Sequence, residues 1–237
     1  MKIYLIIIIV LLLVINCGGS REHFSTMIDL DAITFGKVHP NWQKISQRKV
    51  TEFPLPLPLT KIPKPTKNSS IKTMKEIAYL KKLNKDISAD KIELAKRFYH
   101  YRDVLNFYLK YAGENRLMYS EKYIKRAYRD VLTLAVNMQL LFNRPRPVQL
   151  AYYNSNYFHV IGNAPTPSYP CASVLIAEVL NGLFAYNNPN QRENLEVISQ
   201  NVELSRLYAG LNYPSDIKVA KDVAKIVLKH IKRLEFK

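Results

Sequence analysis

Apolar residues recur at spacings of three and four along the chain from residue 71 onward, which is the period of an amphipathic helix. One such face runs over 94–108 and a second over 124–142. Segment 172–186 is apolar on nearly all sides, which is typical of a buried central helix. Segments 194–210 and 217–231 indicate two further helices.

Glycine and proline mark the expected helix ends. Gly113 follows the first face as a stop, and Pro145 is expected to end the second helix. Glycine is scarce, at 7 of 237 residues, which disfavours a turn-rich β fold. We therefore predict an all-α domain over residues 71–237, a bundle of about six helices with a central buried helix.

Residues 1–20 are interpreted as a targeting segment. Lys2 precedes the apolar stretch from Ile3 to Ile15, which is shorter than the roughly 20 residues of a membrane span but typical of a signal-peptide core. The following residues, with Cys17, resemble a bacterial lipoprotein signal, although Asn16 replaces the usual small residue. An uncleaved signal anchor is the alternative. Either one predicts a secreted or membrane-associated domain outside the cytoplasm, with the N-terminus contacting the membrane.

Residues 21–70 show no clean period and are expected to be extended. Five prolines fall between Phe53 and Pro65, and closely spaced prolines exclude helix and central strand. The segment could serve as a spacer above a membrane, or it could pack along the surface of the domain.

The composition limits the kinds of ligand and partner that we expect for this chain. The net charge of +16 attracts anions or reflects a solvated basic surface, but no basic tract or nucleic-acid motif is present. Two cysteines, Cys17 and Cys171, cannot build a disulfide framework. No zinc-type spacing occurs, so we expect neither a metal nor a cofactor. No protein partner is indicated.

Three polar segments stand out in the helical region. The first is 139–147 (Gln-Leu-Leu-Phe-Asn-Arg-Pro-Arg-Pro), and the second is 167–173 (Pro-Ser-Tyr-Pro-Cys-Ala-Ser). The third is 205–216 (Ser-Arg-Leu-Tyr-Ala-Gly-Leu-Asn-Tyr-Pro-Ser-Asp). Together they resemble the tripartite signature of the phosphatidic acid phosphatase type 2 / vanadium haloperoxidase superfamily, in its soluble acid-phosphatase-like branch. The resemblance covers about residues 75–235.

The resemblance implies a defined chemistry. In the family a Lys, two Arg and helix-start amides bind a phosphate or vanadate anion. A His of the third motif attacks phosphorus, an Asp orients that His, and a His of the second motif protonates the leaving oxygen.

Carried over by position, the resemblance implies an anion site that includes Arg146 and Arg206. Gln139 occupies the Lys position, and Cys171 and Ala172 occupy the Ser and Gly positions of the second motif. The residues at the catalytic positions are Ser173 for the acid, Asn212 for the nucleophile and Asp216 for the orienting carboxylate.

These substitutions remove the reaction. An amide nitrogen is not a usable nucleophile, a serine hydroxyl is not an acid at neutral pH, and loss of the nucleophile alone costs on the order of a million-fold in rate. We therefore expect an inactive pseudophosphatase that keeps an anion pocket. The alternatives are an active phosphomonoesterase using His159 or Cys171, and a lipid-anchored binding or structural surface protein.

Each retained residue also has a structural interpretation. Arg146 and Arg206 could serve as partners of Asp216 and of nearby carbonyl groups. Cys171 could be a reactive thiol at a helix start or a small buried residue. His159 could reach the site or lie on the surface.

Overall fold

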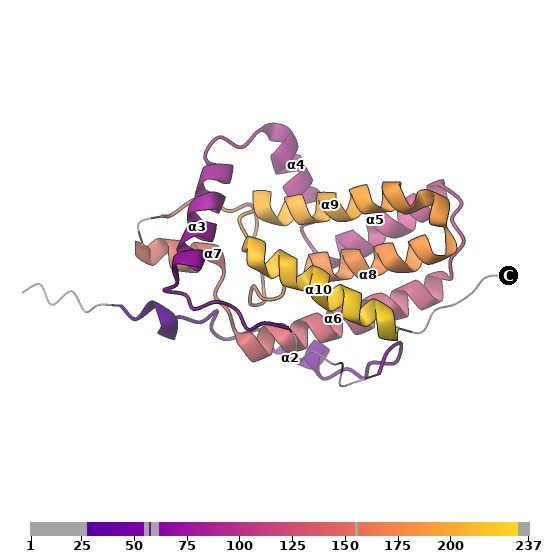
Figure 1. Ribbon diagram of the computed structural model, residues 1–237, viewed down its shortest axis with the longest axis horizontal. Helices are drawn as coiled ribbons and strands as arrows, with labels where there is room; N and C mark the ends of the chain where they lie inside the picture. The colour runs from indigo at the N-terminus through magenta and orange to yellow at the C-terminus, as the bar shows by residue number, and fades with distance from the viewer. Residues whose placement is uncertain (1–27, 55–56, 58–61, 155, 232–237) are drawn as a thin grey trace, which may run out of the picture.

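A computed structural model describes residues 28–54, 57, 62–154 and 156–231. Over these residues the regular structure is entirely helical (Figure 1). The elements are the 3₁₀ helix η1 (Leu30–Ala32), α2 (Pro40–Ser46), α3 (Ile71–Asn84), α4 (Ala89–Arg97), α5 (Tyr101–Glu114), α6 (Glu121–Phe142), α7 (Pro147–Ala151), η3 (Tyr152–Asn154), α8 (Ala172–Asn187), η4 (Pro189–Gln191), α9 (Arg192–Tyr208) and α10 (Pro214–His230).

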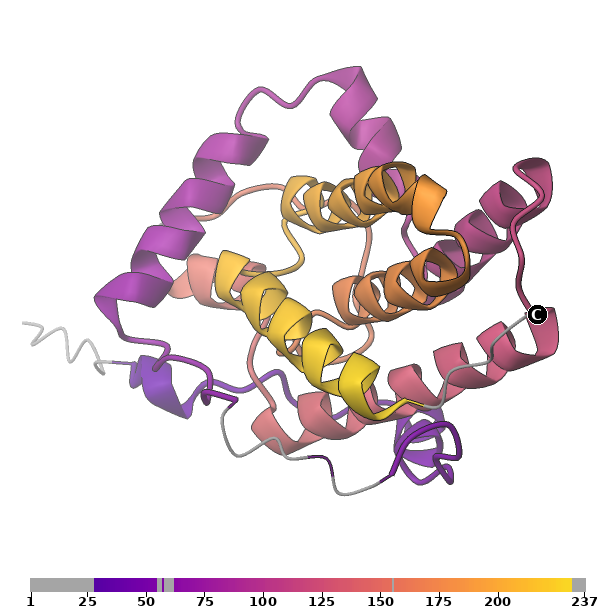
Figure 2. The ribbon, with the colours of Figure 1, turned by 45° about the vertical axis from the view of Figure 1, so that its right-hand side comes forward.

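Helix α8 is the centre of the bundle, as its sequence predicts. It packs against α5, α6, α9 and α10 (Figure 2), and most of its side chains are buried. Gly182 permits the close approach of α10, because a Cβ there would lie 2.6 Å from a methyl carbon of Leu228. The all-α prediction and the central buried helix are confirmed.

The expected count of about six helices is not confirmed, and the predicted single helix over 94–108 is wrong. The chain breaks between α4 and α5, where the Asp103 carboxylate accepts a hydrogen bond of 2.6 Å from the backbone N–H of His100. This contact stabilises a new helix start at Tyr101, and Phe98 leaves helical geometry with φ −115° and ψ 38°. The periodicity continues across the break because both helices face the same core.

Helix α6 ends earlier than Pro145 predicts. Asn143 adopts the left-handed conformation, with φ 43°, and its backbone N–H bonds to the carbonyl of Gln139. This is a C-terminal stop that asparagine tolerates. Arg146 then precedes the first residue of α7, where proline is favoured.

The described part of the 21–70 segment packs on the domain. It contains α2, which lies against α6, and the side chains of Phe53 and Leu57 join the hydrophobic core. The buried Asp130 carboxylate accepts backbone hydrogen bonds from Thr51 (2.6 Å) and Glu52 (2.9 Å). The surface-packing interpretation therefore holds here, and the expected absence of helix is wrong for α2. The predicted targeting segment and Cys17 lie outside the described residues.

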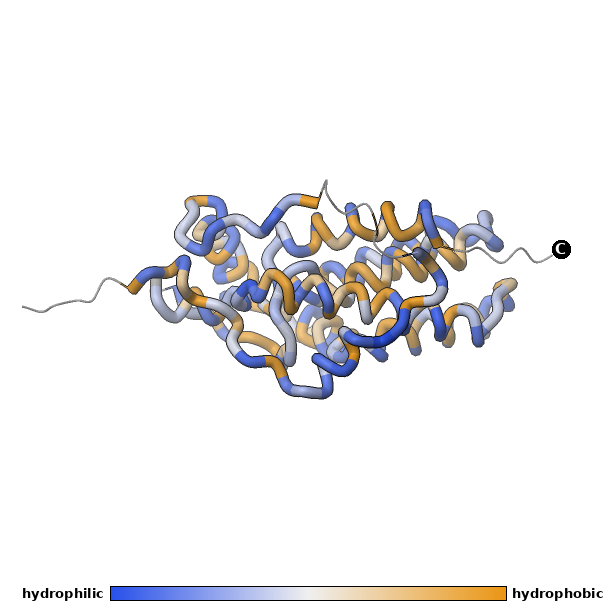
Figure 3. The backbone as a smooth tube through the Cα atoms, turned by 90° about the horizontal axis from the view of Figure 1, so that it is seen from below, coloured by the Kyte–Doolittle hydropathy of each residue, from blue (hydrophilic) through white to orange (hydrophobic). Residues whose placement is uncertain are grey.

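Polar and apolar residues alternate along most helices (Figure 3), which is the pattern of helices packed around a shared core. Within the described residues, no helix is both long and apolar enough to cross a membrane.

Candidate functional site

The three polar segments meet at the N-terminus of α8. Five of the residues singled out from the sequence line one cavity of about 360 Å³: Arg146, Ala172, Ser173, Arg206 and Asn212. They come from the α7 start, the α8 start, the last turn of α9 and the loop before α10. Residues as far apart in sequence as Arg146 and Asn212 are thus brought to one place.

Three other predicted site residues lie beside the cavity without lining it. Gln139 is fully buried, and its Nε2 donates to the Pro170 carbonyl at 3.0 Å. Cys171 is the N-cap residue of α8, and Asp216 is buried within the first turn of α10. All three belong to the buried surroundings of the cavity and not to its lining.

The guanidinium of Arg146 joins the second and third segments. Its Nε and Nη2 donate to the Thr166 carbonyl at 2.9 and 2.7 Å, and Nη2 also donates to the Pro167 carbonyl at 2.9 Å. Its Nη1 donates to the Leu211 carbonyl at 2.8 Å. These acceptors are neutral, so they fix the side chain without cancelling its charge.

Arg206 is also buried and keeps an uncompensated charge. Its Nη1 donates to the Phe98 carbonyl at 2.6 Å, at the break between α4 and α5. Among the described residues, neither Arg206 nor Arg146 forms an ion pair with a carboxylate. Burial lowers the pKa of Arg206, and the positive charge of Arg146 lowers it further, although the Cys171 thiol acts in the opposite direction.

The partner of Asp216 is Arg144, a residue that the sequence interpretation did not assign. Nη1 of Arg144 lies 2.6 Å from the Asp216 carboxylate, and both side chains are buried. The Arg144 guanidinium also stacks 3.8 Å from the ring centre of Tyr213. The sequence offered one indication of this role, namely that Arg144 lies two residues before Arg146. Asp216 therefore bonds to the arginine that the family pattern does not specify.

The pKa values of both members of the pair are raised. Burial lowers the pKa of Arg144, but the carboxylate of Asp216 raises it above its ordinary value. Burial raises the pKa of Asp216, while Arg144 and the backbone N–H of Tyr213 (2.9 Å) act against that change. The pair is best described as an internal salt bridge joining the α6–α7 loop to α10.

Asn212, which the resemblance places at the nucleophile position, is held by hydrogen bonds. Its Nδ2 donates to the Ser168 carbonyl at 2.8 Å and lies 3.4 Å from Oδ2 of Asp216. The amide nitrogen is thus a hydrogen-bond donor held by two acceptors. Ser173, which the resemblance places at the acid position, is buried at the start of α8.

The start of α8 adds positive character to the cavity. No side chain caps its first turn, and early helix amides have no partner within the helix. Ala172 and Ser173, whose amides belong to this turn, line the cavity. Helix-start amides beside two cationic side chains form a site suited to an anion.

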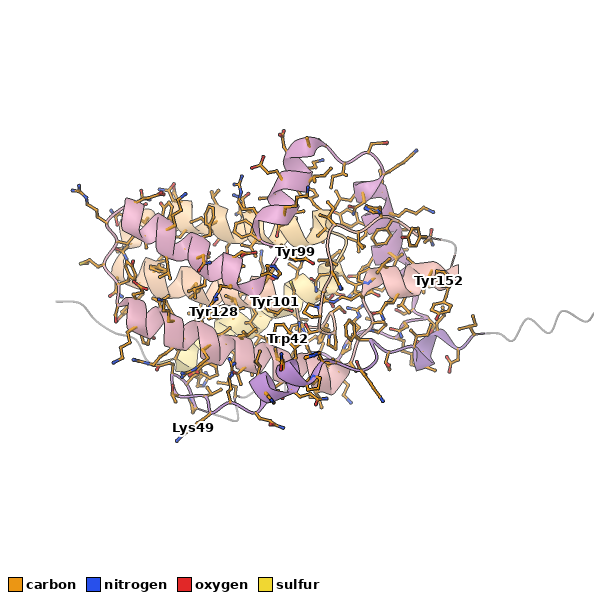
Figure 4. The ribbon with its side chains drawn as sticks, turned by 180° about the vertical axis from the view of Figure 1, so that it is seen from behind. Trp42, Lys49, Tyr99, Tyr101, Tyr128 and Tyr152 are labelled. Carbon is orange, nitrogen blue, oxygen red and sulfur yellow. The ribbon has the colours of Figure 1, made fainter. Side chains whose placement is uncertain are left out.

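Aromatic side chains form part of the cavity wall. Trp42, Tyr99, Tyr101 and Tyr128 line it and gather on one face of the molecule (Figure 4). The sequence analysis did not identify these four residues. The one available signal was the high tyrosine content of the chain, 16 residues. Trp42 comes from α2, Tyr99 from the break between α4 and α5, Tyr101 from α5 and Tyr128 from α6.

The histidine at the cavity is not the one that the sequence analysis considered. His159 is exposed and does not line the cavity, whereas His100 does. The His100 ring lies 4.4 Å from that of Tyr99, centre to centre. Cys171 is buried, and burial raises its pKa to about 11, so its thiol is unreactive at neutral pH.

Comparison with known proteins adds no relative. No family model matches the chain, and no curated protein matches it. Within the described residues, no group of three or more His, Cys, Asp or Glu side chains is placed to hold a metal ion.

Proposed function

We propose that this chain is a degenerate member of the phosphatidic acid phosphatase type 2 / haloperoxidase superfamily that binds a phosphate-like anion without hydrolysing it. The all-α fold is compatible with this assignment. The order of the three segments and their meeting at the start of α8 support it further, because an unrelated bundle has no reason to gather them.

The observation that carries the proposal is the pair Arg146 and Arg206. Both are buried, both line the cavity, and in the described part of the chain neither is paired with a carboxylate. A buried charge without a counter-ion costs several kcal/mol. An anion held between the two guanidinium groups and the α8 amides would offset that cost through charge-assisted hydrogen bonds.

Turnover requires groups that the cavity lacks at the expected positions. Asn212 and Ser173 stand where the family resemblance requires a nucleophile and an acid, and the buried Cys171 thiol stays protonated at neutral pH. We therefore propose an anion-binding protein displayed on a membrane surface or secreted. The lipid-anchored binding or structural role is compatible with this proposal and rests on Cys17. Fatty-acid labelling of the natural chain but not of Cys17→Ser would support the lipid anchor, and equal labelling would remove it.

Orthophosphate titration of the full-length protein tests anion binding. We expect saturable heat of binding by calorimetry and a rise in melting temperature with phosphate. Arg206→Met should weaken binding at least tenfold, because it removes one of two buried cations. Arg192→Met is the matched control, since Arg192 is exposed at the far end of the same helix. Equal affinity in both variants would reject the site.

One observation favours a second function, an active phosphomonoesterase with relocated chemistry. His100 offers an imidazole at the cavity, and such a ring could act as a nucleophile toward phosphorus. Phosphate release that disappears in His100→Ala would establish this alternative.

A further inference from the structure

The cavity is much larger than the anion that its arginines would bind. A five-atom inorganic anion displaces only a few waters of roughly 30 Å³ each, whereas the cavity measures about 360 Å³. That volume falls within the range of about 300–1,000 Å³ found for organic ligands. The remaining space is large enough for an organic group attached to the anion.

Four aromatic side chains form a wall of the cavity, which His100 and Arg102 also line. Trp42 and Tyr101 meet edge to face, with ring centres 5.5 Å apart and planes at 85°. Tyr99 and Tyr128 continue the wall, and all four rings are only partly exposed. Rings arranged in this way present both faces and edges, which favour offset or edge-to-face contact with another ring.

Hydrogen bonds connect the aromatic wall to the proposed anion site. The Tyr101 hydroxyl bonds to the Thr166 hydroxyl at 2.8 Å, and the carbonyl of Thr166 accepts from Arg146. The Tyr99 hydroxyl accepts from the backbone N–H of Asn163 at 2.9 Å. The rings of Tyr99 and Tyr101 are therefore held in place before any ligand arrives, and a pre-organised site loses less entropy on binding.

We propose that the cavity selects a phosphate monoester whose organic group is an aromatic ring. The phosphate would occupy the end formed by Arg146, Arg206 and the α8 amides, and the ring would pack against Trp42, Tyr101 and Tyr128. This assignment rests on the proposed anion site and adds the class of ligand. A rigid aromatic wall favours a flat ring over a flexible alkyl chain, because the chain must lose rotational freedom to fit.

Four ligands separate the contribution of the phosphate group to binding from that of the organic group. They are inorganic phosphate, phenyl phosphate, hexyl phosphate and phenol. Calorimetry on the full-length protein should show phenyl phosphate binding at least tenfold more tightly than inorganic phosphate and than hexyl phosphate. Phenol alone should bind weakly. Trp42→Leu should reduce the affinity for phenyl phosphate about tenfold and leave that for inorganic phosphate unchanged. Tyr152→Leu is the control, because Tyr152 is exposed and outside the cavity.

Circular dichroism checks that each variant is folded, and Tyr128→Leu replaces Trp42→Leu if the latter unfolds. Equal affinity for phenyl and hexyl phosphate would overturn the aromatic selection. Binding of phosphate with no gain for phenyl phosphate would also overturn it, while leaving the anion site intact. If no phosphate compound binds, the proposed function itself fails.

Discussion

Replacing Asp216 by asparagine should strongly destabilise the fold. The Asp216 carboxylate lies 2.6 Å from Nη1 of Arg144, and neither side chain is more than 1% exposed. Asp216→Asn leaves that guanidinium with Glu76 as its remaining carboxylate, at 3.6 Å. Breaking a buried pair by removing one partner costs about 3–5 kcal/mol, which is a large part of the roughly 5–15 kcal/mol that stabilises a domain.

Urea denaturation measures this loss. At an m value of about 2 kcal/mol/M, a loss of about 4 kcal/mol moves the midpoint by about 2 M. Asp222→Asn is the control, because its ion pair with Lys225 is solvent-exposed and should contribute less than about 1 kcal/mol. A loss below about 1 kcal/mol for Asp216→Asn would refute the view that this carboxylate is now a structural group.

Three changes test other parts of the account. Gly210→Ala should cost about 2 kcal/mol in thermal unfolding, since Gly210 has φ 68° and a Cβ there would lie 2.6 Å from the Phe158 ring. Gly113→Ala, which meets nothing within 4 Å in a helix, should instead stabilise by up to about 1 kcal/mol, so similar losses at both glycines would contradict the argument. Because burial raises the pKa of Cys171 from 9.0 to about 11, the protonated thiol favours the folded state, and stability should fall by up to about 2–3 kcal/mol between pH 9 and 11. Denaturation across that range should lose this component in Cys171→Ala, and an identical slope in both proteins would exclude the thiol as its source.

Periodicity was sufficient to predict the helical class and the central helix. The apolar sequence of α8 has no polar face to expose, so its burial followed directly from composition. The break at Phe98–His100 was not predicted, because the apolar residues that α4 and α5 contribute to the same core keep the helical spacing across the break. The capping contact of Asp103 is visible only when the backbone path is known.

The sequence also located part of the site. Arg146, Arg206 and Asn212 were singled out because their spacing resembles a family pattern, and the structure places them at one cavity. The aromatic wall was missed because Trp42 and Tyr128 belong to elements with no shared motif. Arg144 was missed because the pattern specifies only the second arginine of its segment, while pairing with Asp216 depends on packing across 72 positions.

The central claim, an anion site without turnover, is tested most directly by measuring binding and phosphate release on one sample. Full-length protein is equilibrated with phenyl phosphate, bound ester is measured by dialysis, and free phosphate is then assayed. We expect saturable binding that is lost in Arg206→Met, with phosphate release no faster than in buffer. Release above that background that vanishes in His100→Ala, His159→Ala or Cys171→Ala would contradict it, because the site would then be rebuilt rather than inactive.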